Sequence, residues 1–311
     1  MANHPLTSNF NYFFGRLNPS STFEKKASEH YSAVKALIED RRGLAGELSP
    51  VCFLQGSYGH ETATYTINDV DIVALCQLWQ PGPGNGGRSY DRDEIFDTVA
   101  APLLNDWRYK DTVRYNGQSM CIKLDTEPRI EILPVVFKSG TYDDSSEPFR
   151  LFRPENNQWE DGYARYHKGW LSWKNQESKT QTNFVPAIKV FKHLRTQFSL
   201  DTISFHLECL LFSLPDYLFL GGPADYIPAL LEHISATPAS AWYSQYVPTP
   251  CRDRDIFVAT EWKKQDWEKF HEVATVWAKA ARLANQATDK DDAIEYWRIL
   301  LGEDSFPRTV S

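Results

Sequence analysis

The chain has 311 residues, 42% of them hydrophobic, and a formal net charge of −8 at pH 7. This composition excludes a disordered chain, and the length predicts either two lobes or one large elaborated domain. No run of lysine and arginine exceeds two residues, which argues against binding of DNA or RNA by a basic surface and against nucleic acid as an activator or substrate.

The cysteines and the apolar segments indicate the compartment. The five cysteines are an odd number without a Cys-x-x-Cys pair, so we expect reduced core thiols and no zinc site or disulfide framework. The longest apolar stretch, 207–220, is interrupted by Glu208 and Asp216, and no charged segment followed by an apolar one opens the chain. We therefore expect a cytoplasmic protein that does not cross a membrane.

The first half of the chain predicts a helix followed by a sheet. Residues 20–44 place apolar side chains at helical spacing, and short β-branched runs bounded by polar residues predict strands. The strands are expected at 50–55, 69–79, 119–125 and 129–137, with a further helix at 93–108. The glycine- and proline-rich segment Pro81–Gly87 is interpreted as a flexible connection, with a mobile lid as the alternative.

A Gly-Ser turn and a paired-aspartate strand are the most informative features. Leu54-Gln55-Gly56-Ser57 ends an apolar run, and Asp69-Val70-Asp71 follows after a helix-sized segment. Side chains at i and i+2 share one face of a strand, so Asp69 and Asp71 project together. Two such carboxylates repel each other and favour a divalent cation such as Mg²⁺, while Gly56 lets the backbone approach a phosphate. Either motif alone is common in turns and surface strands; their joint spacing favours a nucleotide triphosphate site.

At these residues the chain resembles the DNA polymerase β-like nucleotidyltransferases, and within them the bacterial cGAS/DncV-like enzymes (CD-NTases). These enzymes carry a third carboxylate before a hydrophobic pair and a proline. Glu131 in Arg129-Ile130-Glu131-Ile132-Leu133-Pro134 fits that position, although aspartate is usual there. The resemblance therefore implies that Asp69, Asp71 and Glu131 are the catalytic and metal-binding residues.

The resemblance also assigns residues of the second half to the substrate. Ala187–Arg195 has an amphipathic helical period, and its basic residues taken alone are those of a solvated face. In the family a lysine of this helix approaches the triphosphate, and Lys192 is the best match, with Lys189 second. Ser204 and Phe205 match a phosphate-binding serine and a base-stacking ring, with packing in the core as the alternative role of Phe205. Asp253, in a loop after Pro250, is included with Gln55, Gly56 and Ser57 among the substrate-binding candidates.

The remaining pattern predicts a helical second half. Helices are expected at 183–198, 203–219, 224–235, 262–287 and 290–301. The resemblance implies an α+β fold, with a polymerase β-like catalytic lobe over 1–150 that contains a mixed sheet and a helical lobe over 151–311. A long first helix is expected to span both lobes, and the nucleotide is expected in the cleft between them.

The activity that the resemblance implies is metal-dependent synthesis of a cyclic di- or trinucleotide from ATP, GTP or other NTPs. Mg²⁺ is the expected cofactor, with Mn²⁺ as a substitute, and the protein is expected to be a monomer. Its product would act on a cyclic-nucleotide-responsive effector in bacterial anti-phage (CBASS) signalling. Two alternatives stay open: nucleotidyl transfer to a small molecule, protein or RNA acceptor, and a degenerate member that binds nucleotides without turnover.

Overall fold

The computed structural model describes residues 6–78, 89–138 and 148–310. The predicted connection Pro81–Gly87 lies outside these ranges. Contacts divide the chain into two compact units. The helical unit comprises Met1–Pro19, Thr62–Tyr65 and Gly169–Ser311, and the sheet unit comprises Ser20–Glu61 and Thr66–Lys168. The predicted lobes, 1–150 and 151–311, have other bounds and stay a proposal about domains.

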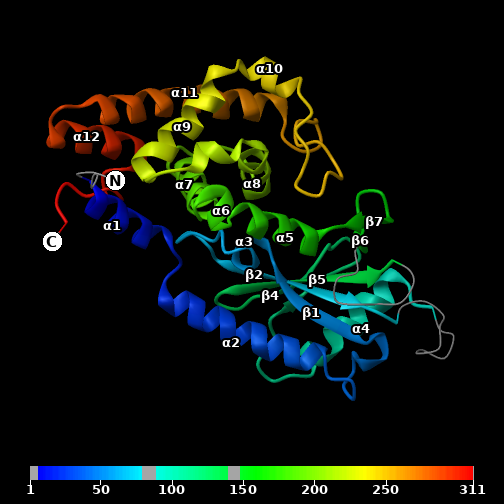
Figure 1. Cartoon of the computed structure of the whole chain (residues 1–311). Helices are drawn as coiled ribbons and strands as arrows, with labels where there is room; N and C mark the ends of the chain where they lie inside the picture. The colour runs from blue at the N-terminus through cyan, green and yellow to red at the C-terminus, as the bar shows by residue number, and fades with distance from the viewer. Residues whose placement is uncertain (1–5, 79–88, 139–147, 311) are drawn as a thin grey trace. The chain divides into compact units, whose positions relative to one another are not determined.

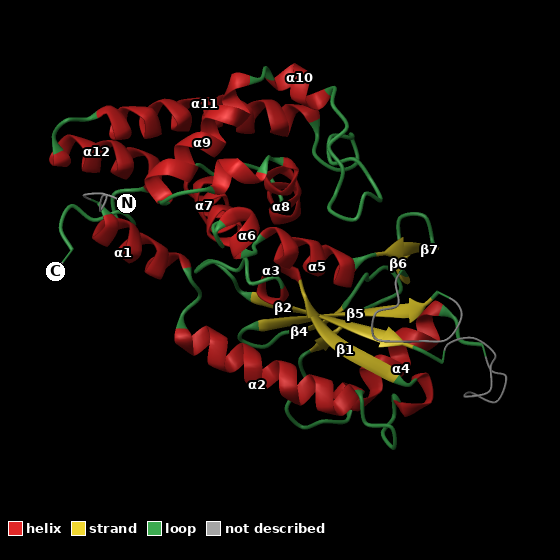
Figure 2. Cartoon of the chain, viewed as in Figure 1, coloured by secondary structure: helices red, strands yellow, loops and turns green. Residues whose placement is uncertain are grey.

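The sheet unit contains all the strands of the described residues (Figures 1 and 2). Its helical elements are α2 (Ser21–Ile38), η1 (Gly46–Leu48), α3 (Gly56–Gly59) and α4 (Arg92–Leu104). Its strands are β1 (Pro50–Gln55), β2 (Asp69–Cys76), β3 (Val113–Arg114), β4 (Ile122–Leu124), β5 (Arg129–Phe137), β6 (Phe149–Arg153) and β7 (Gln158–Gly162). The strand predicted at 129–137 has its predicted bounds, and the short strands β3, β6 and β7 were not predicted.

The sheet is mixed, and its order is β1-β2-β5-β4-β3. Only the β2–β5 pair in this order is parallel, while β1 and β4 run antiparallel to β2 and β5. Strand β6 pairs with the end of β5 and β7 pairs with β6. Because β2 and β5 run in the same direction, they need a crossover, and α4 lies in the segment that joins them.

The two faces of the sheet differ in what covers them. Val70, Ile72 and Ala74 alternate along β2 and lie in one core with apolar residues of α2 and α4. Val73 and Leu75 point to the other face, where they form a smaller core with residues of β5 and β6. Asp69 and Asp71 share the parity of Val73, so the two carboxylates occupy that second face, as the strand period predicts.

The helical unit consists of the elements α1 (Thr7–Leu17), α6 (Glu177–Thr180), α7 (Phe184–Gln197), α8 (Ser204–Ser213), η2 (Asp216–Phe219), α9 (Pro223–Ala236), α10 (Ala239–Tyr243), α11 (Lys264–Gln286) and α12 (Lys290–Leu301). Helix α5 (Ala164–Lys174) crosses the boundary between the units. The α+β fold is therefore confirmed. The single helix predicted at 203–219 is interrupted at Leu214-Pro215, because proline disfavours a helical conformation of the preceding residue. Within the described ranges, no helix has both the length and the apolar character that crossing a membrane requires.

The predicted N-terminal helix differs in its bounds. Residues 20–44 form α2 only as far as Ile38, where Glu39 is the C-cap and a turn follows. A separate helix, α1, precedes it and belongs to the helical unit, whereas α2 belongs to the sheet unit. Ser20 caps the start of α2 by accepting a hydrogen bond from the backbone N–H of Phe23, which fixes the break between the two helices.

The core of the helical unit is rich in tryptophan. Trp267 of α11 is fully buried, and its ring lies 4.7 Å from that of Phe257 and 5.0 Å from that of Trp262, between ring centroids. Its indole N–H donates to the carbonyl of Ala239 at 2.9 Å. Trp267 therefore ties the long helix α11 both to the preceding loop and to α10.

Replacing Trp267 by alanine should reduce the free energy of unfolding by about 3–5 kcal/mol, because it removes a large buried side chain and leaves a cavity. Urea unfolding followed by circular dichroism measures this change. Trp107→Ala is the control, since Trp107 is 81% exposed, and it should change stability by no more than about 0.5 kcal/mol. Equal stability of the two variants would contradict the assigned packing.

Candidate active site

Four polar side chains form one row across neighbouring strands of the sheet unit. Gln55 of β1 pairs with Asp71 of β2, Asp71 pairs with Glu131 of β5, and Glu131 pairs with Lys123 of β4. Residues paired in register point to the same face of a sheet. The register thus brings together two of the three predicted carboxylates, which lie far apart in the sequence.

All four residues of this row line a single pocket of about 590 Å³. Gly56 and the segment from Gln118 to Cys121 line it as well. The volume lies in the range of small-molecule sites, about 300–1,000 Å³. The sheet unit by itself therefore provides a concave surface with two carboxylates, an amide and an ammonium group.

Gly56 makes room for the carboxylate of Asp71. Its φ is +65°, in the left-handed region that favours glycine. A Cβ atom at this position would lie 1.8 Å from Oδ2 of Asp71. Ser57, the next residue, is half-buried in α3. Glycine is thus required at position 56 both by the backbone conformation and by the close approach of a carboxylate.

Burial and mutual repulsion raise the pKa values of the two aspartates. Burial raises the pKa of Asp71 to about 7, and the negative charges of Asp69 and Glu131 add to this effect. Burial also raises the pKa of Asp69, again with a contribution from Glu131, while Arg129 and Lys123 act in the opposite direction. The three acidic side chains are therefore close enough to repel one another in a partly dry environment.

Glu131 is held by two residues of the preceding strand region. Nζ of Lys123 lies 3.1 Å from Oε1 of Glu131, and Sγ of Cys121 donates to Oε2 at 3.6 Å. Burial, together with Glu131, raises the pKa of the Cys121 thiol to about 11. Cys121 is a free thiol, as predicted for all five cysteines, but it belongs to the pocket and not to the core. The sequence analysis did not select Lys123. Its spacing of two residues from Cys121 indicates only that the two side chains share one face of a strand.

The sequence of this chain matches the family described as "Second Messenger Oligonucleotide or Dinucleotide Synthetase domain" over residues 5–175. This chain belongs to that family. It is a nucleotidyltransferase of the cGAS/DncV-like (CD-NTase) class, as the Gly-Ser and paired-aspartate motifs suggested.

One curated relative of this CD-NTase is the cyclic UMP-AMP synthase of Rhodothermus marinus. It is 22% identical over an alignment of 239 residues that covers 70% of this chain and 81% of the relative. Among solved structures, Escherichia coli CdnC with ATP has a TM-score of 0.71 at 15% identity, covering 96% of this chain and 98% of that one. Escherichia coli DncV in its 3′-deoxy GTP form has a TM-score of 0.67 at 12% identity, covering 96% and 98%. These structures show the shared polymerase β-like fold.

The acidic face of this CD-NTase suits a hard divalent cation. Its donors are carboxylate oxygens, which Mg²⁺ and Mn²⁺ prefer, and their repulsion is of the kind that a bound cation relieves. Gly56 makes room for the Asp71 carboxylate itself, because a Cβ there would lie 1.8 Å from its Oδ2. Asp69, Asp71 and Glu131 are therefore the residues that would hold the cation.

The lysine of α7 that was predicted to contact the triphosphate makes several hydrogen bonds within the helical unit. Lys192 is buried, and its Nζ donates to Oε1 of Glu208 at 2.8 Å and to the hydroxyl and carbonyl oxygens of Thr62 at 2.8 and 3.2 Å. Three acceptors thus match the three N–H groups of the ammonium. Lys189, the second candidate, is half-buried and donates to Oδ1 of Asn18 at 2.8 Å.

The other predicted substrate residues of the helical unit lie on α8 and in the loop before α11. The hydroxyl of Ser204 accepts a hydrogen bond from Nη1 of Arg195 at 3.1 Å, an arginine that sequence reasoning did not select. Phe205 packs partly against the helical core, with the guanidinium of Arg254 over its ring. Asp253 accepts a hydrogen bond from Thr249. The roles of these residues toward a nucleotide stay predictions.

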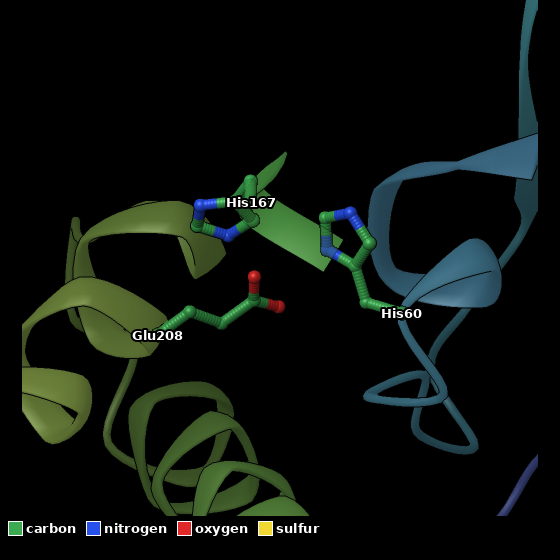
Figure 3. A group of neighbouring side chains, drawn as sticks. All are labelled: His60, His167 and Glu208. Carbon is green, nitrogen blue, oxygen red and sulfur yellow. The ribbon is translucent and has the colours of Figure 1, made fainter. Parts of the chain in front are cut away.

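Three further titratable side chains are drawn in Figure 3. The imidazole rings of His60 and His167 both belong to the sheet unit and lie 5.0 Å apart between centroids. Glu208 belongs to the helical unit, where its Oε1 also accepts a hydrogen bond from the Thr62 hydroxyl at 2.6 Å. Apart from the row of four, the sheet unit therefore has two neighbouring histidines, and the helical unit has the buried carboxylate of Glu208.

Gly56→Ala should lower the free energy of unfolding by about 1–3 kcal/mol, because the residue must leave its positive φ and the Asp71 carboxylate must move. Thermal unfolding of the purified protein measures the loss. Gly117→Ala is the matched control in the same unit, since a Cβ there meets nothing within 4 Å. Adding Asp71→Ala to Gly56→Ala should recover part of the stability; no recovery would show that the oxygen contact is not the cause.

The raised pKa of Asp71 predicts a pH-dependent stability of the metal-free protein. Between about pH 4 and about pH 7 the folded state binds more protons than the unfolded state, so stability falls as the pH rises through this window. The asparagine side chain of the Asp71→Asn variant cannot ionise and avoids this loss. In EDTA, the stability of Asp71→Asn relative to wild type should therefore grow by roughly 2 kcal/mol from about pH 5 to about pH 8. Urea unfolding at several pH values measures it, and a constant difference would be inconsistent with the buried, repelled carboxylate.

Proposed function

We propose that this CD-NTase joins nucleoside triphosphates into a cyclic di- or trinucleotide second messenger. The observation that carries the proposal is the row of Gln55, Asp71 and Glu131 in one pocket beside Gly56. Nucleotidyl transfer needs acidic residues that gather divalent cations and a backbone that a triphosphate can approach, and this row supplies both. The family to which the chain belongs supports cyclisation as the outcome.

The substrates in this proposal are ATP, GTP or both. The related structures support this choice, since CdnC is described with ATP and DncV with 3′-deoxy GTP. The Rhodothermus marinus CdnE structure is described with Apcpp and Upnpp, which makes other NTPs candidates too. We infer that the protein acts as a monomer in the cytoplasm and that its product activates an effector in anti-phage (CBASS) signalling.

In the proposed reaction, the oxygen of an acceptor ribose hydroxyl, whose proton passes to solvent, bonds to the α-phosphorus of a triphosphate. The bond from that phosphorus to the oxygen bridging the β-phosphate breaks, and pyrophosphate leaves. Asp69, Asp71 and Glu131 would hold the divalent cation, which when bound would supply positive charge at the phosphates and make the acceptor hydroxyl more acidic. Gly56 allows the backbone to approach the phosphates, and the Ser57 hydroxyl donates to an anionic oxygen. These groups contribute position and charge and form no covalent intermediate.

The helical unit contributes the remaining substrate contacts in this proposal. Ser204 offers a hydroxyl to the triphosphate, and Lys189 or Lys192 offers positive charge. Phe205 stacks on a base, and Asp253 accepts hydrogen bonds from a nucleotide. Because Lys192 already has three acceptors, it contacts phosphate only by giving up a hydrogen bond to Thr62 or Glu208. A cyclic product also requires that the linear intermediate bind in a second orientation.

Incubating the protein with all four NTPs and Mg²⁺ or Mn²⁺ should yield a cyclic product that mass spectrometry identifies, without any added acceptor. Asp71→Asn should reduce the rate of its formation by a factor on the order of 10²–10³ or more. Asp111→Asn, which alters an aspartate of the same unit outside the pocket, should leave the rate unchanged. Wild-type turnover in Asp71→Asn would refute the proposed site, and tight Mg²⁺-dependent ATP binding without any product would favour the degenerate alternative.

A further inference from the structure

Lys123 is the member of the row of four that the sequence did not predict, and the proposed chemistry gives it no role. It lies on β4 directly opposite Glu131 and lines the same pocket. Its Nζ is 3.1 Å from Oε1 of Glu131. Cys121, on the same face of the same strand region, donates to the other oxygen of Glu131. Both oxygens of the third carboxylate are therefore engaged by groups on the β4 side.

The strand order determines toward which neighbouring strand Lys123 draws Glu131. Strand β5 lies between β2 and β4, so Glu131 has Asp71 on one side and Lys123 on the other. The ion pair thus draws the Glu131 carboxylate toward β4 and away from the aspartates of β2. A divalent cation shared by Asp71 and Glu131 requires the opposite position. Lys123 and the cation therefore compete for the same carboxylate.

The length of the Glu131 side chain makes this competition effective. Glutamate has one methylene more than aspartate, and with it one more rotatable bond, so its carboxylate can reach either neighbouring strand. Among the described residues, Lys123 and Arg129 are the cations whose charge opposes the raised pKa of Asp69. The positive charge of Lys123 therefore also offsets part of the repulsion among the carboxylates.

We propose that Lys123 is a positioning residue of the metal centre, which holds Glu131 on the β4 side and weakens divalent-cation binding by competing for its carboxylate. This inference rests on the proposed function, because it requires that Asp69, Asp71 and Glu131 bind a cation. Lys123 acts through Glu131 and through its charge, and it need not touch the substrate.

The alternative interpretation is that the ion pair of Lys123 and Glu131 has no influence on cation binding. The side chains of Lys123 and Glu131 are 46% and 24% exposed, and pairs with such exposure contribute little to folding. On that reading, removal of the lysine changes neither the stability nor the cation affinity appreciably. The affinity for a cation in the absence of nucleotide therefore separates the two readings without any measurement of turnover.

The test is a titration of Mn²⁺ into nucleotide-free protein, followed by the electron paramagnetic resonance signal of free Mn²⁺. Lys123→Met should bind Mn²⁺ about tenfold more tightly than wild type, the effect expected for removing one unit charge several ångströms from a divalent cation near water. Lys123→Arg keeps the charge and should stay within about twofold of wild type. Lys138→Met is the matched control, because Lys138 pairs with Asp161 at a similar exposure in the same unit.

Lys123→Gln is measured beside Lys123→Met, so that the result does not depend on how one uncharged side chain packs, and thermal unfolding without metal verifies that both are folded. Unchanged or weaker Mn²⁺ binding in the folded uncharged variants would overturn the role of Lys123. Loss of Mn²⁺ binding in Asp71→Asn is expected if the proposed metal centre exists. If wild type itself binds no Mn²⁺, the metal centre of the proposed function fails, and the inference about Lys123 fails with it.

Discussion

The parallel pairing of β2 with β5 is the constraint on which the site depends. This register sets Asp71 beside Glu131, and both line one pocket. Carboxylates placed so close in a partly buried position are costly, as the raised pKa values of Asp69 and Asp71 indicate. The apolar side chains of the same strands are fully buried, and this packing keeps the register in spite of the repulsion.

The acidic residues of the pocket differ in their surroundings. The carboxylate of Asp71 lies against Gly56, where any residue with a Cβ would collide with it. Burial raises the pKa of Asp71 to about 7. Glu131 lies farther along the row and has a cation and a thiol as neighbours. The departure from aspartate at this position therefore comes with local partners on the β4 side. The longer side chain of Glu131 and the ammonium group of Lys123 on the adjacent strand form an ion pair.

A second polar arrangement is built into the helical unit. Lys192 and Glu208 are both nearly inaccessible, and Thr62 donates to the carboxylate while it accepts from the ammonium. Breaking such a buried pair by removing one partner typically costs about 3–5 kcal/mol, because the remaining charge loses its compensation. Removal of Lys192 alone should therefore destabilise the helical unit. This structural role accompanies whatever contact it makes with a substrate.

Sequence patterns were enough to predict the strand at 129–137, the helices α7, α9, α11 and α12, the shared face of Asp69 and Asp71, and the family. These features depend on local periodicity and on short motifs, which a chain carries without its tertiary structure. The tertiary structure decided the row from Gln55 to Lys123, because strand register joins residues from four separate segments. It also decided that Cys121 faces the pocket and that Lys192 is paired with Glu208. No spacing within one segment encodes which charge lies opposite another across a sheet or between helices.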